Sequence, residues 1–531
     1  MARPSLLLVL LILTISVGCV GTEDTESVEP FDVIIRGGRV LDGSGNPWVT
    51  ADVAFRGDRI VAVGDLGRAV AHRVVDADGL FVSPGFIDTH SHAGGALETQ
   101  ELSPALPLLA QGITTVAVNP DGGGVVNIVE QRGALEAHGL GVNTISLVPH
   151  GSVRRTVMGM DDRGPTAQEL ERMGALVRGG MEAGAYGLSS GLFYTPGNFA
   201  QTEELVALAR VVSEFGGVYQ SHVRDEATYT VGVLRAVEEV IRVAEEGSVR
   251  GVITHIKALG PEAWGMAEEI VASVEAARSR GVEVFADQYP YIASSTGLKA
   301  ALVPAWAQEG GDDAMRARFQ DPEGRREIRA AMVENLARRG GAGRITLNSV
   351  ESDSGLEGRT LASVADALGI DAVDAALELL SAEAPGILSY SMREEDLRTF
   401  MVRPWTITAS DGSLSADGDG LPHPRSYGTF PRKLATYARD LGVLDLADAI
   451  RTMTSLPAAV YRIEGRGSLR PGAAADVVVF DVDRLADRAT FEEPRQLADG
   501  IVHLWVNGVA AIEDGHPTGA LGGRALRKGA Q

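Results

Sequence analysis

The chain has 531 residues, of which 45% are apolar and 22% are charged, and its formal net charge at pH 7 is −23. This length is sufficient for a large buried core, and the composition is that of an ordinary globular protein. The acidic charge argues against nucleic acid as a partner, because no basic surface is available to neutralise phosphates.

The N-terminus resembles an export signal followed by a tether. An apolar run from Leu6 to Val17, too short to span a bilayer comfortably, leads to Cys19, which is the only cysteine of the chain. This pattern resembles a bacterial lipoprotein signal, with residues 1–18 as signal peptide, Cys19 as the lipidated residue and residues 19–30 as an acidic tether. An ordinary secretory signal is the alternative. In both cases we expect an exported protein of the cell envelope, periplasmic or at the cell surface. In the first case the lipid on Cys19 would be its only attachment to the membrane.

Both ends of the remaining chain are rich in short β-branched runs that glycine and aspartate interrupt, which is typical of strands. We predict a small β-sandwich domain built from both termini, from residues 31–83 and 466–515, with residues 516–531 as a tail. The runs are "FDVIIRGGRVLDG", "ADVAFRGDRIVAVG", "HRVVDADGLFVSPG", "GAAADVVVFDV" and "IVHLWVNGVAAIEDG".

Between these parts, apolar runs alternate with amphipathic helical patterns, which indicates a parallel sheet. There are eight such runs: "GFIDTHSH", "GITTVAVNPD", "NTISLVPH", "AYGLSSGL", "GVYQSHV", "GVITHIK", "GVEVFADQYPY" and "TITASDG". Eight strands predict an α/β fold of the (β/α)₈ TIM-barrel type over residues 84–465. Residues 292–404 are too long for one connection, so we expect an insertion with helices of its own.

Histidines and aspartates collect where these runs end. The residues are His90, His92, Asp121, His150, His222, His255 and Asp411. His90 and His92 are two positions apart, so their imidazoles point to the same side of a strand. Since the C-terminal strand ends of a barrel converge on one active site, the pattern predicts a metal site in that cavity.

Several stretches together resemble the N-acyl-D-amino-acid deacylase (D-aminoacylase) family of the amidohydrolase superfamily, over about residues 31–515. They are "SPGFIDTHSH", "GITTV", "SSGLFYTPG", "SHVRDE", "THIKALG", "ASDG", "HPRSYGTFPR" and "MTSLPAAVYRIEGRGSLRPGAAADVVVFD". The resemblance implies zinc held by His90, His92, His222 and His255, with Asp411 as the catalytic carboxylate beside the metal. Zinc would make hydroxide available at neutral pH, and Asp411 would take the proton from water and deliver it to the leaving amine.

The chain departs from this family at Asp121. Where D-aminoacylases usually carry a metal-binding cysteine, this chain has "VNPDGGG", and no lysine precedes Lys257 to form the carboxylated bridge of hydantoinases. We therefore expect Asp121 to be a metal ligand; a turn residue without a metal role is the alternative. Because carboxylate is a harder ligand than thiolate, Mn²⁺ or another divalent ion stays open beside Zn²⁺, as does the choice of one or two ions.

By the same resemblance, Lys257, Tyr289 and Arg425 would hold the α-carboxylate of the substrate, and Tyr194 would assist its carbonyl or acyl group. Ser295 is a further candidate for substrate binding, whereas the roles of His150 and His423 are left open. A guanidinium suits a carboxylate because it can form two parallel hydrogen bonds.

The leading hypothesis is a metal-dependent hydrolase of small N-acyl-D-amino acids, or of dipeptides with a D residue. The alternatives are a cyclic-amide hydrolase of hydantoinase or dihydroorotase type and a non-catalytic surface lipoprotein that keeps the barrel as a binding module. The missing bridging lysine argues against the former, and the presence of every candidate ligand argues against the latter.

Overall fold

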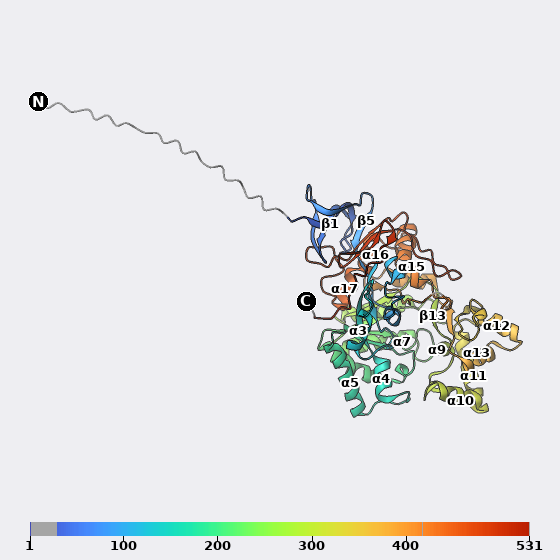
Figure 1. The fold of residues 1–531 in the computed structure, drawn as a ribbon. Coiled ribbons are helices and arrows are strands. Elements are labelled where there is room, and N and C mark those ends of the chain that lie inside the picture. Colours follow the sequence, from blue (N-terminus) through green and yellow to red (C-terminus); the bar gives the residue numbers. More distant parts are fainter. Residues whose placement is uncertain (2–28, 417, 530–531) are drawn as a thin grey trace.

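The computed structural model describes residues 1, 29–416 and 418–529 (Figure 1). The predicted signal peptide and the lipidation site Cys19 lie outside these described residues, as does most of the predicted tether. Within the described part of the chain, no helix combines the length and the apolar character needed to cross a membrane.

Eight parallel strands form the nearly closed barrel that the sequence predicts, and each corresponds to one of the eight apolar runs. Their order around the barrel is β6-β7-β8-β9-β10-β11-β12-β16. The bounds are β6 Phe86–Asp88, β7 Ile113–Val118, β8 Asn143–Pro149, β9 Gly187–Gly191, β10 Val218–His222, β11 Arg250–Ile253, β12 Val284–Gln288 and β16 Thr406–Thr408. These strands are almost entirely buried, as expected when side chains fill the inside and helices cover the outside.

The helices of the barrel follow the amphipathic segments between the strands. They include α3 (Ile128–Glu136), α4 (His150–Met158), α5 (Ala167–Glu182), α6 (Thr202–Ser213), α7 (Val233–Gly247), α8 (Ala267–Ser279), α14 (Glu394–Met401), α15 (Arg425–Arg432), α16 (Leu446–Met453) and α17 (Ser455–Tyr461). The apolar face of α7 illustrates why they dock: Val233, Val237, Val240 and Ala244 recur at helical spacing and are all buried.

The barrel closes between β6 and β16 through a few backbone contacts just beyond both strands. The N–H of Asp411 donates to the carbonyl of His90 at 2.9 Å, and the N–H of His92 donates to the carbonyl of Gly412 at 2.8 Å. The buried Asp88 carboxylate accepts the N–H of Ser410 at 2.9 Å, which ties the same two chain segments together. The closure therefore lies at the C-terminal end of the barrel.

The small β domain draws strands from both termini, as predicted, and they form one nine-stranded mixed sheet. Its strands are β1 (Phe31–Val40), β2 (Val49–Arg56), β3 (Arg59–Gly64), β4 (Ala71–Asp76), β5 (Phe81–Pro84), β17 (Val477–Phe480), β18 (Ile501–Val506), β19 (Val509–Glu513) and β20 (His516–Pro517). Strand β5 joins the two halves, because it pairs in parallel with β1 and antiparallel with β17. Beyond β20, Gly523 and Ala525 form bridges to Leu140 and Thr144, so the C-terminal segment lies against the start of β8.

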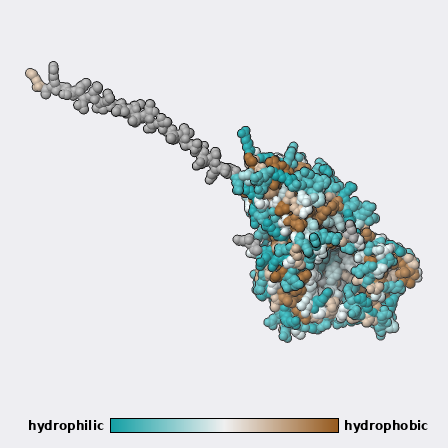
Figure 2. Space-filling view, viewed as in Figure 1, coloured by the Kyte–Doolittle hydropathy of each residue, from teal (hydrophilic) through white to brown (hydrophobic). Residues whose placement is uncertain are grey.

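The segment between β12 and β16 folds into a lobe beside the barrel, seen in yellow in Figure 1. It contains a three-stranded antiparallel sheet, β13 (Ser294–Gly297), β15 (Gly386–Ser389) and β14 (Ile345–Ser349), with helices α9 (Leu298–Leu302), α10 (Asp312–Gln320), α11 (Pro322–Arg338), α12 (Leu361–Leu368) and α13 (Ala372–Ala382). The lobe has an apolar cluster of its own, which includes Phe319, Met332 and Leu377. In the space-filling view, hydrophilic residues dominate the visible surface, and it is hollowed between the barrel and this lobe (Figure 2).

Candidate metal centre

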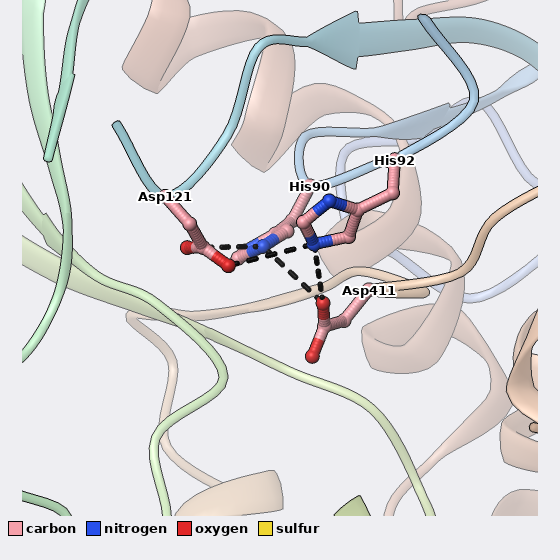
Figure 3. A group of neighbouring side chains, drawn as sticks. All are labelled: His90, His92, Asp121 and Asp411. Carbon is pink, nitrogen blue, oxygen red and sulfur yellow. Dashed lines mark hydrogen bonds and ion pairs between the residues drawn. The ribbon is translucent and has the colours of Figure 1, made fainter. Parts of the chain in front are cut away.

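His90, His92, Asp121 and Asp411 converge at the closure of the barrel (Figure 3). The Nε2 atom of His92 lies 3.1 Å from Oδ1 of Asp411 and 3.4 Å from Oδ2 of Asp121. The Nε2 atom of His90 lies 3.4 Å from Asp411 and 3.3 Å from Asp121. One ligand atom from each of these four residues lies within 4.8 Å of the others.

A second group overlaps the first, because Asp121, His222 and His255 also bring their ligand atoms within 4.8 Å of one another. The Nε2 of His255 lies 2.8 Å from Nδ1 of His222, and Asp121 is 3.6 Å from that Nδ1. Asp121 thus stands between the two groups. The structure therefore brings together all six residues that the sequence predicts as ligands.

These residues fit a divalent metal. Nε2 of His90, Oδ1 of Asp121 and Nε2 of His222 are buried and have no hydrogen-bond partner. A buried polar atom without a partner is costly, so such a cluster is stable when a ligand satisfies it. Imidazole and carboxylate donors in two overlapping groups suit a binuclear site for Zn²⁺ or a similar ion.

The two carboxylates of the cluster, Asp121 and Asp411, stay ionised in spite of their burial. Burial alone would raise the pKa of Asp121, but the neighbouring imidazoles of His90 and His222 outweigh it and hold that pKa well below its usual range. For Asp411, the guanidinium of Arg425 and the imidazole of His90 likewise outweigh burial and lower the pKa. Metal ligands must be deprotonated, and these two meet that condition at neutral pH.

A cavity of about 240 Å³ opens from the metal residues. All five residues predicted to bind substrate line it: Tyr194, Lys257, Tyr289, Ser295 and Arg425. The cations among them already have partners in the cavity wall, since Nη1 of Arg425 lies 2.7 Å from Oδ2 of Asp411 and Lys257 contacts Glu226. The Arg425 guanidinium also lies over the ring of Tyr289, 4.7 Å from its centroid. The cavity thus pairs both of these cations with carboxylates of its own wall.

Sequence reasoning missed two residues that support this site, and it left the role of a third open. Glu226 pairs with Lys257 and lies 3.0 Å from Nδ1 of His255. Asp287 accepts the N–H of His255 at 2.5 Å and lies 3.6 Å from Nδ1 of His90. Both had a signal in the sequence: Glu226 follows His222 by four residues in "SHVRDE", and Asp287 is near the end of β12.

The third is His423, whose role the sequence left open. Its Nδ1 accepts the N–H of Arg425 at 2.9 Å, and its Nε2 lies 3.0 Å from the carbonyl of Ala293. This network assigns the ring proton to Nε2, which requires a neutral imidazole. Burial and the charge of Arg425 agree with that assignment, because both hold the pKa of His423 well below its usual range. His423 therefore positions Arg425.

One strand-end histidine does not join the cluster. The ring of His150 is buried, and its Nε2 lies 2.8 Å from Oε1 of Glu204, which also pairs with Arg154. His150 belongs to neither of the two candidate ligand groups. The role that the sequence left open for His150 is therefore not that of a ligand in these groups, because His150 begins α4 and its side chain packs toward α6.

Comparisons with known proteins agree with this geometry. The model of the amidohydrolase family matches residues 73–512. The chain is 36% identical to the D-aminoacylase of Alcaligenes xylosoxydans xylosoxydans over 524 residues, which covers 94% of this chain and 98% of that protein.

Solved structures give the same result. A D-aminoacylase structure, described with a binuclear metal centre, one-metal activation and second-metal attenuation, has a TM-score of 0.80 at 35% identity and covers 94% of this chain and 100% of its own. The N-acyl-D-glutamate deacylase of Bordetella bronchiseptica, complexed with zinc and a phosphonate inhibitor that mimics the tetrahedral intermediate, has a TM-score of 0.79 at 34% identity with the same coverage. A D-hydantoinase, at 14% identity and a TM-score of 0.56, shares the fold alone.

Substituting Asp121 tests its place in both ligand groups. Asn retains the shape and tolerates the left-handed backbone that residue 121 adopts, at φ 55°. We expect Asp121→Asn to fold normally but to bind metal roughly 10–100-fold more weakly, or worse, because the charged ligand is lost. The measurement is metal content and affinity by elemental analysis after dialysis against buffered metal.

Matched variants separate the two groups. His92→Asn changes only the first group and His255→Asn only the second, so each should affect one ion at most. Asp121→Cys restores the thiolate of the relatives and should favour zinc over manganese. If Asp121→Asn binds metal like the wild type, Asp121 is only a turn residue.

Proposed function

The chain belongs to the D-aminoacylase family of amidohydrolases, and on that premise we propose that it hydrolyses the linear amide bond of N-acyl-D-amino acids or of dipeptides with a D residue. The observation that carries this proposal is the position of Asp411, which lies between the histidine pair and a substrate-sized cavity. Similarity over 94% of the chain to a D-aminoacylase supports the same activity.

We propose zinc as the resident metal, in one or two ions, with Mn²⁺ or another divalent ion as the alternative. The ligands would be His90, His92, Asp121, His222, His255 and Asp411. A zinc-bound relative supports this assignment. When bound, such an ion supplies Lewis acidity, which lowers the pKa of water and polarises the substrate carbonyl.

Asp411 would carry the proton of the reaction. An ionised carboxylate at the cavity wall can accept a proton from the attacking water and return it to the leaving nitrogen. Its Oδ1 lies toward the histidine pair and its Oδ2 toward Arg425, so the group touches both the water side and the substrate side of the cavity. The backbone contact to His90 holds it there.

Arg425, Lys257 and Tyr289 would bind the α-carboxylate of the substrate. Stacking of Arg425 on Tyr289, together with the hydrogen bond from its backbone to His423, fixes the guanidinium at the cavity wall. The α-carboxylate of a bound substrate would replace Asp411 as the ion-pair partner of Arg425. Tyr194, whose hydroxyl lies 3.2 Å from that of Thr296, and Ser295 complete the wall and would contact the acyl group or the carboxylate.

The alternative activities have less support. A hydantoinase-type site needs a bridging carboxylated lysine, and no lysine precedes Lys257 in the chain. The hydantoinase likeness extends to the fold alone. A non-catalytic binding module would not need a full ligand set with an ionised carboxylate beside it, and this site has both.

We also propose export and lipidation. The apolar run Leu6–Val17 with Cys19 directly beyond Gly18 supports a signal peptide whose first mature residue is lipidated. The substrate would then be met in the cell envelope.

The activity is tested on a panel of N-acetyl-D- and N-acetyl-L-amino acids and D-containing dipeptides. We expect hydrolysis of D substrates that depends on added divalent metal. Asp411→Asn keeps the shape and tolerates φ 50°, and it should lower kcat by about 10²–10⁴-fold, because it removes proton transfer. Absence of hydrolysis with every D substrate in the metal-loaded protein would refute the proposal.

The carboxylate clamp is tested with Arg425→Met. For substrates with a free α-carboxylate, we expect kcat/KM to fall, because transition-state binding should weaken by about 2–5 kcal/mol. This is the usual cost of removing one partner of a buried charge pair. The corresponding α-amide substrates should be poor for the wild type and should change little in the variant. Equal kcat/KM in both proteins would mean that the carboxylate binds elsewhere.

Lipidation is tested by fractionation of expressing cells. The wild type should sediment with membranes and Cys19→Ser should not. If both proteins are equally soluble after export, the chain is simply secreted.

A further inference from the structure

Arg339 is a buried cation that has no anionic partner. Only 2% of its surface is exposed, and its Nε and Nη1 atoms have no hydrogen-bond partner. Among the described residues, no carboxylate lies within ion-pair distance of it. An unpaired charge that is removed from water is strongly destabilising, so a site of this kind is suited to an anion that arrives later.

The chain holds Arg339 in the cavity wall by a close backbone approach. Helix α11 of the inserted lobe ends at Arg338, and the Arg338 carbonyl packs against Gly260 in the loop after β11. A Cβ at Gly260 would lie 2.0 Å from that carbonyl, and its φ is +84°, so only glycine allows the contact. The carbonyl of Arg339 also accepts the Ser391 hydroxyl at 3.2 Å. Arg339 is therefore anchored to the loop that follows Lys257.

Arg339 lines the same cavity as the metal residues. Its guanidinium lies 5.7 Å from the ring of Tyr229, which contacts Phe193, and the Phe193 ring in turn stacks on His222. A chain of two aromatic rings thus connects Arg339 to His222, one of the candidate metal ligands. Ser294, which also lines the cavity, has a buried hydroxyl without a partner.

The other two cations of the cavity already have carboxylate partners. Arg425 pairs with Asp411 and Lys257 pairs with Glu226, both at the metal end. The α-carboxylate of a substrate must lie near that end, since it is one bond from the α-carbon that bears the scissile amide nitrogen. Arg339 is the cation left for a second negative group, one that extends away from the reacting bond.

We propose that Arg339 is a specificity-determining residue that binds a carboxylate on the side chain of the D-amino acid. This inference rests on the proposed deacylase function, and it names the substrate class as N-acyl-D-glutamate or N-acyl-D-aspartate. A guanidinium binds a carboxylate through two parallel hydrogen bonds. A neutral side chain would leave Arg339 buried and unpaired, which selects against such substrates.

The experiment compares kcat/KM of the metal-loaded, full-length protein for N-acetyl-D-glutamate, N-acetyl-D-aspartate, N-acetyl-D-glutamine and N-acetyl-D-leucine. Glutamine matches glutamate in shape and lacks only the charge. We expect the wild type to prefer D-glutamate over D-glutamine by about 100-fold or more. Arg339→Met should abolish that preference by lowering kcat/KM for the acidic substrates, while kcat/KM for the neutral substrates changes less than about threefold.

Arg338→Met is the matched control. Arg338 also lies near Tyr229, at 6.0 Å, but it is hydrogen-bonded to Asn335 and paired with Glu334. This variant should keep the wild-type preference. Arg339→Lys retains the positive charge but lacks the planar guanidinium, so it should keep part of the preference for acidic substrates.

Each outcome decides the inference. A wild-type ratio near one for D-glutamate over D-glutamine overturns it, whether or not the variants fold. If kcat/KM falls equally for all substrates in a folded Arg339→Met protein, the inference is also overturned, because Arg339 would then bind the α-carboxylate or stabilise the structure of the site. Hydrolysis of none of these D substrates would refute the proposed function itself, whereas hydrolysis of neutral D substrates without an acidic preference would refute only the role of Arg339.

Discussion

The contact between the first and last barrel strands determines the geometry of the whole site. β6 and β16 are separated by more than 300 residues of chain, yet the backbone of Asp411 is hydrogen-bonded to His90 and that of Gly412 to His92. These two backbone bonds hold Asp411, the proposed catalytic carboxylate, against the histidine pair. Asp88 reinforces the closure, because its buried carboxylate accepts the N–H groups of both Ser410 and His90. Any change that opened the closure between β6 and β16 would therefore move Asp411 away from His90 and His92.

A second layer of carboxylates holds the imidazoles in orientation. Asp287 accepts the backbone N–H of His255 and faces Nδ1 of His90, while Glu226 faces Nδ1 of His255 and neutralises Lys257. Metal-binding histidines generally depend on such partners, which fix the ring and increase its basicity. Because the cavity also pairs Arg425 with Asp411, its buried charges are mostly balanced before any ligand arrives. Arg339 is the exception, because no carboxylate among the described residues pairs with it, and the proposed partner is a carboxylate of the substrate.

Sequence patterns predicted the barrel, the two-part β domain and the ligand set because each has a local signature. The eight strands are apolar runs with polar ends, and barrel geometry brings such ends together. The role of His150 stayed open in the sequence, because its position at a strand end does not determine the direction of a side chain that begins a helix. The contacts made by Glu226, His423 and Arg339 could not be predicted from the sequence, although the position of Glu226 four residues after His222 was a signal for its role. These contacts join loops and an inserted helix that are distant along the chain.

The backbone at three of the ligand positions explains why an aspartate suits position 121. Asp121, His255 and Asp411 all have positive φ, between 36° and 55°, a conformation that costs most residues about 1–2 kcal/mol and that aspartate tolerates better. The carbonyl of Asp121 packs against Gly191 at the end of β9, where a Cβ would approach it to 2.1 Å, so this close contact requires glycine at position 191. A residue at position 121 must adopt the left-handed conformation and, in the proposed metal site, must also supply a ligand. Aspartate does both, whereas the cysteine of the family pattern has the ligand without the conformational tolerance.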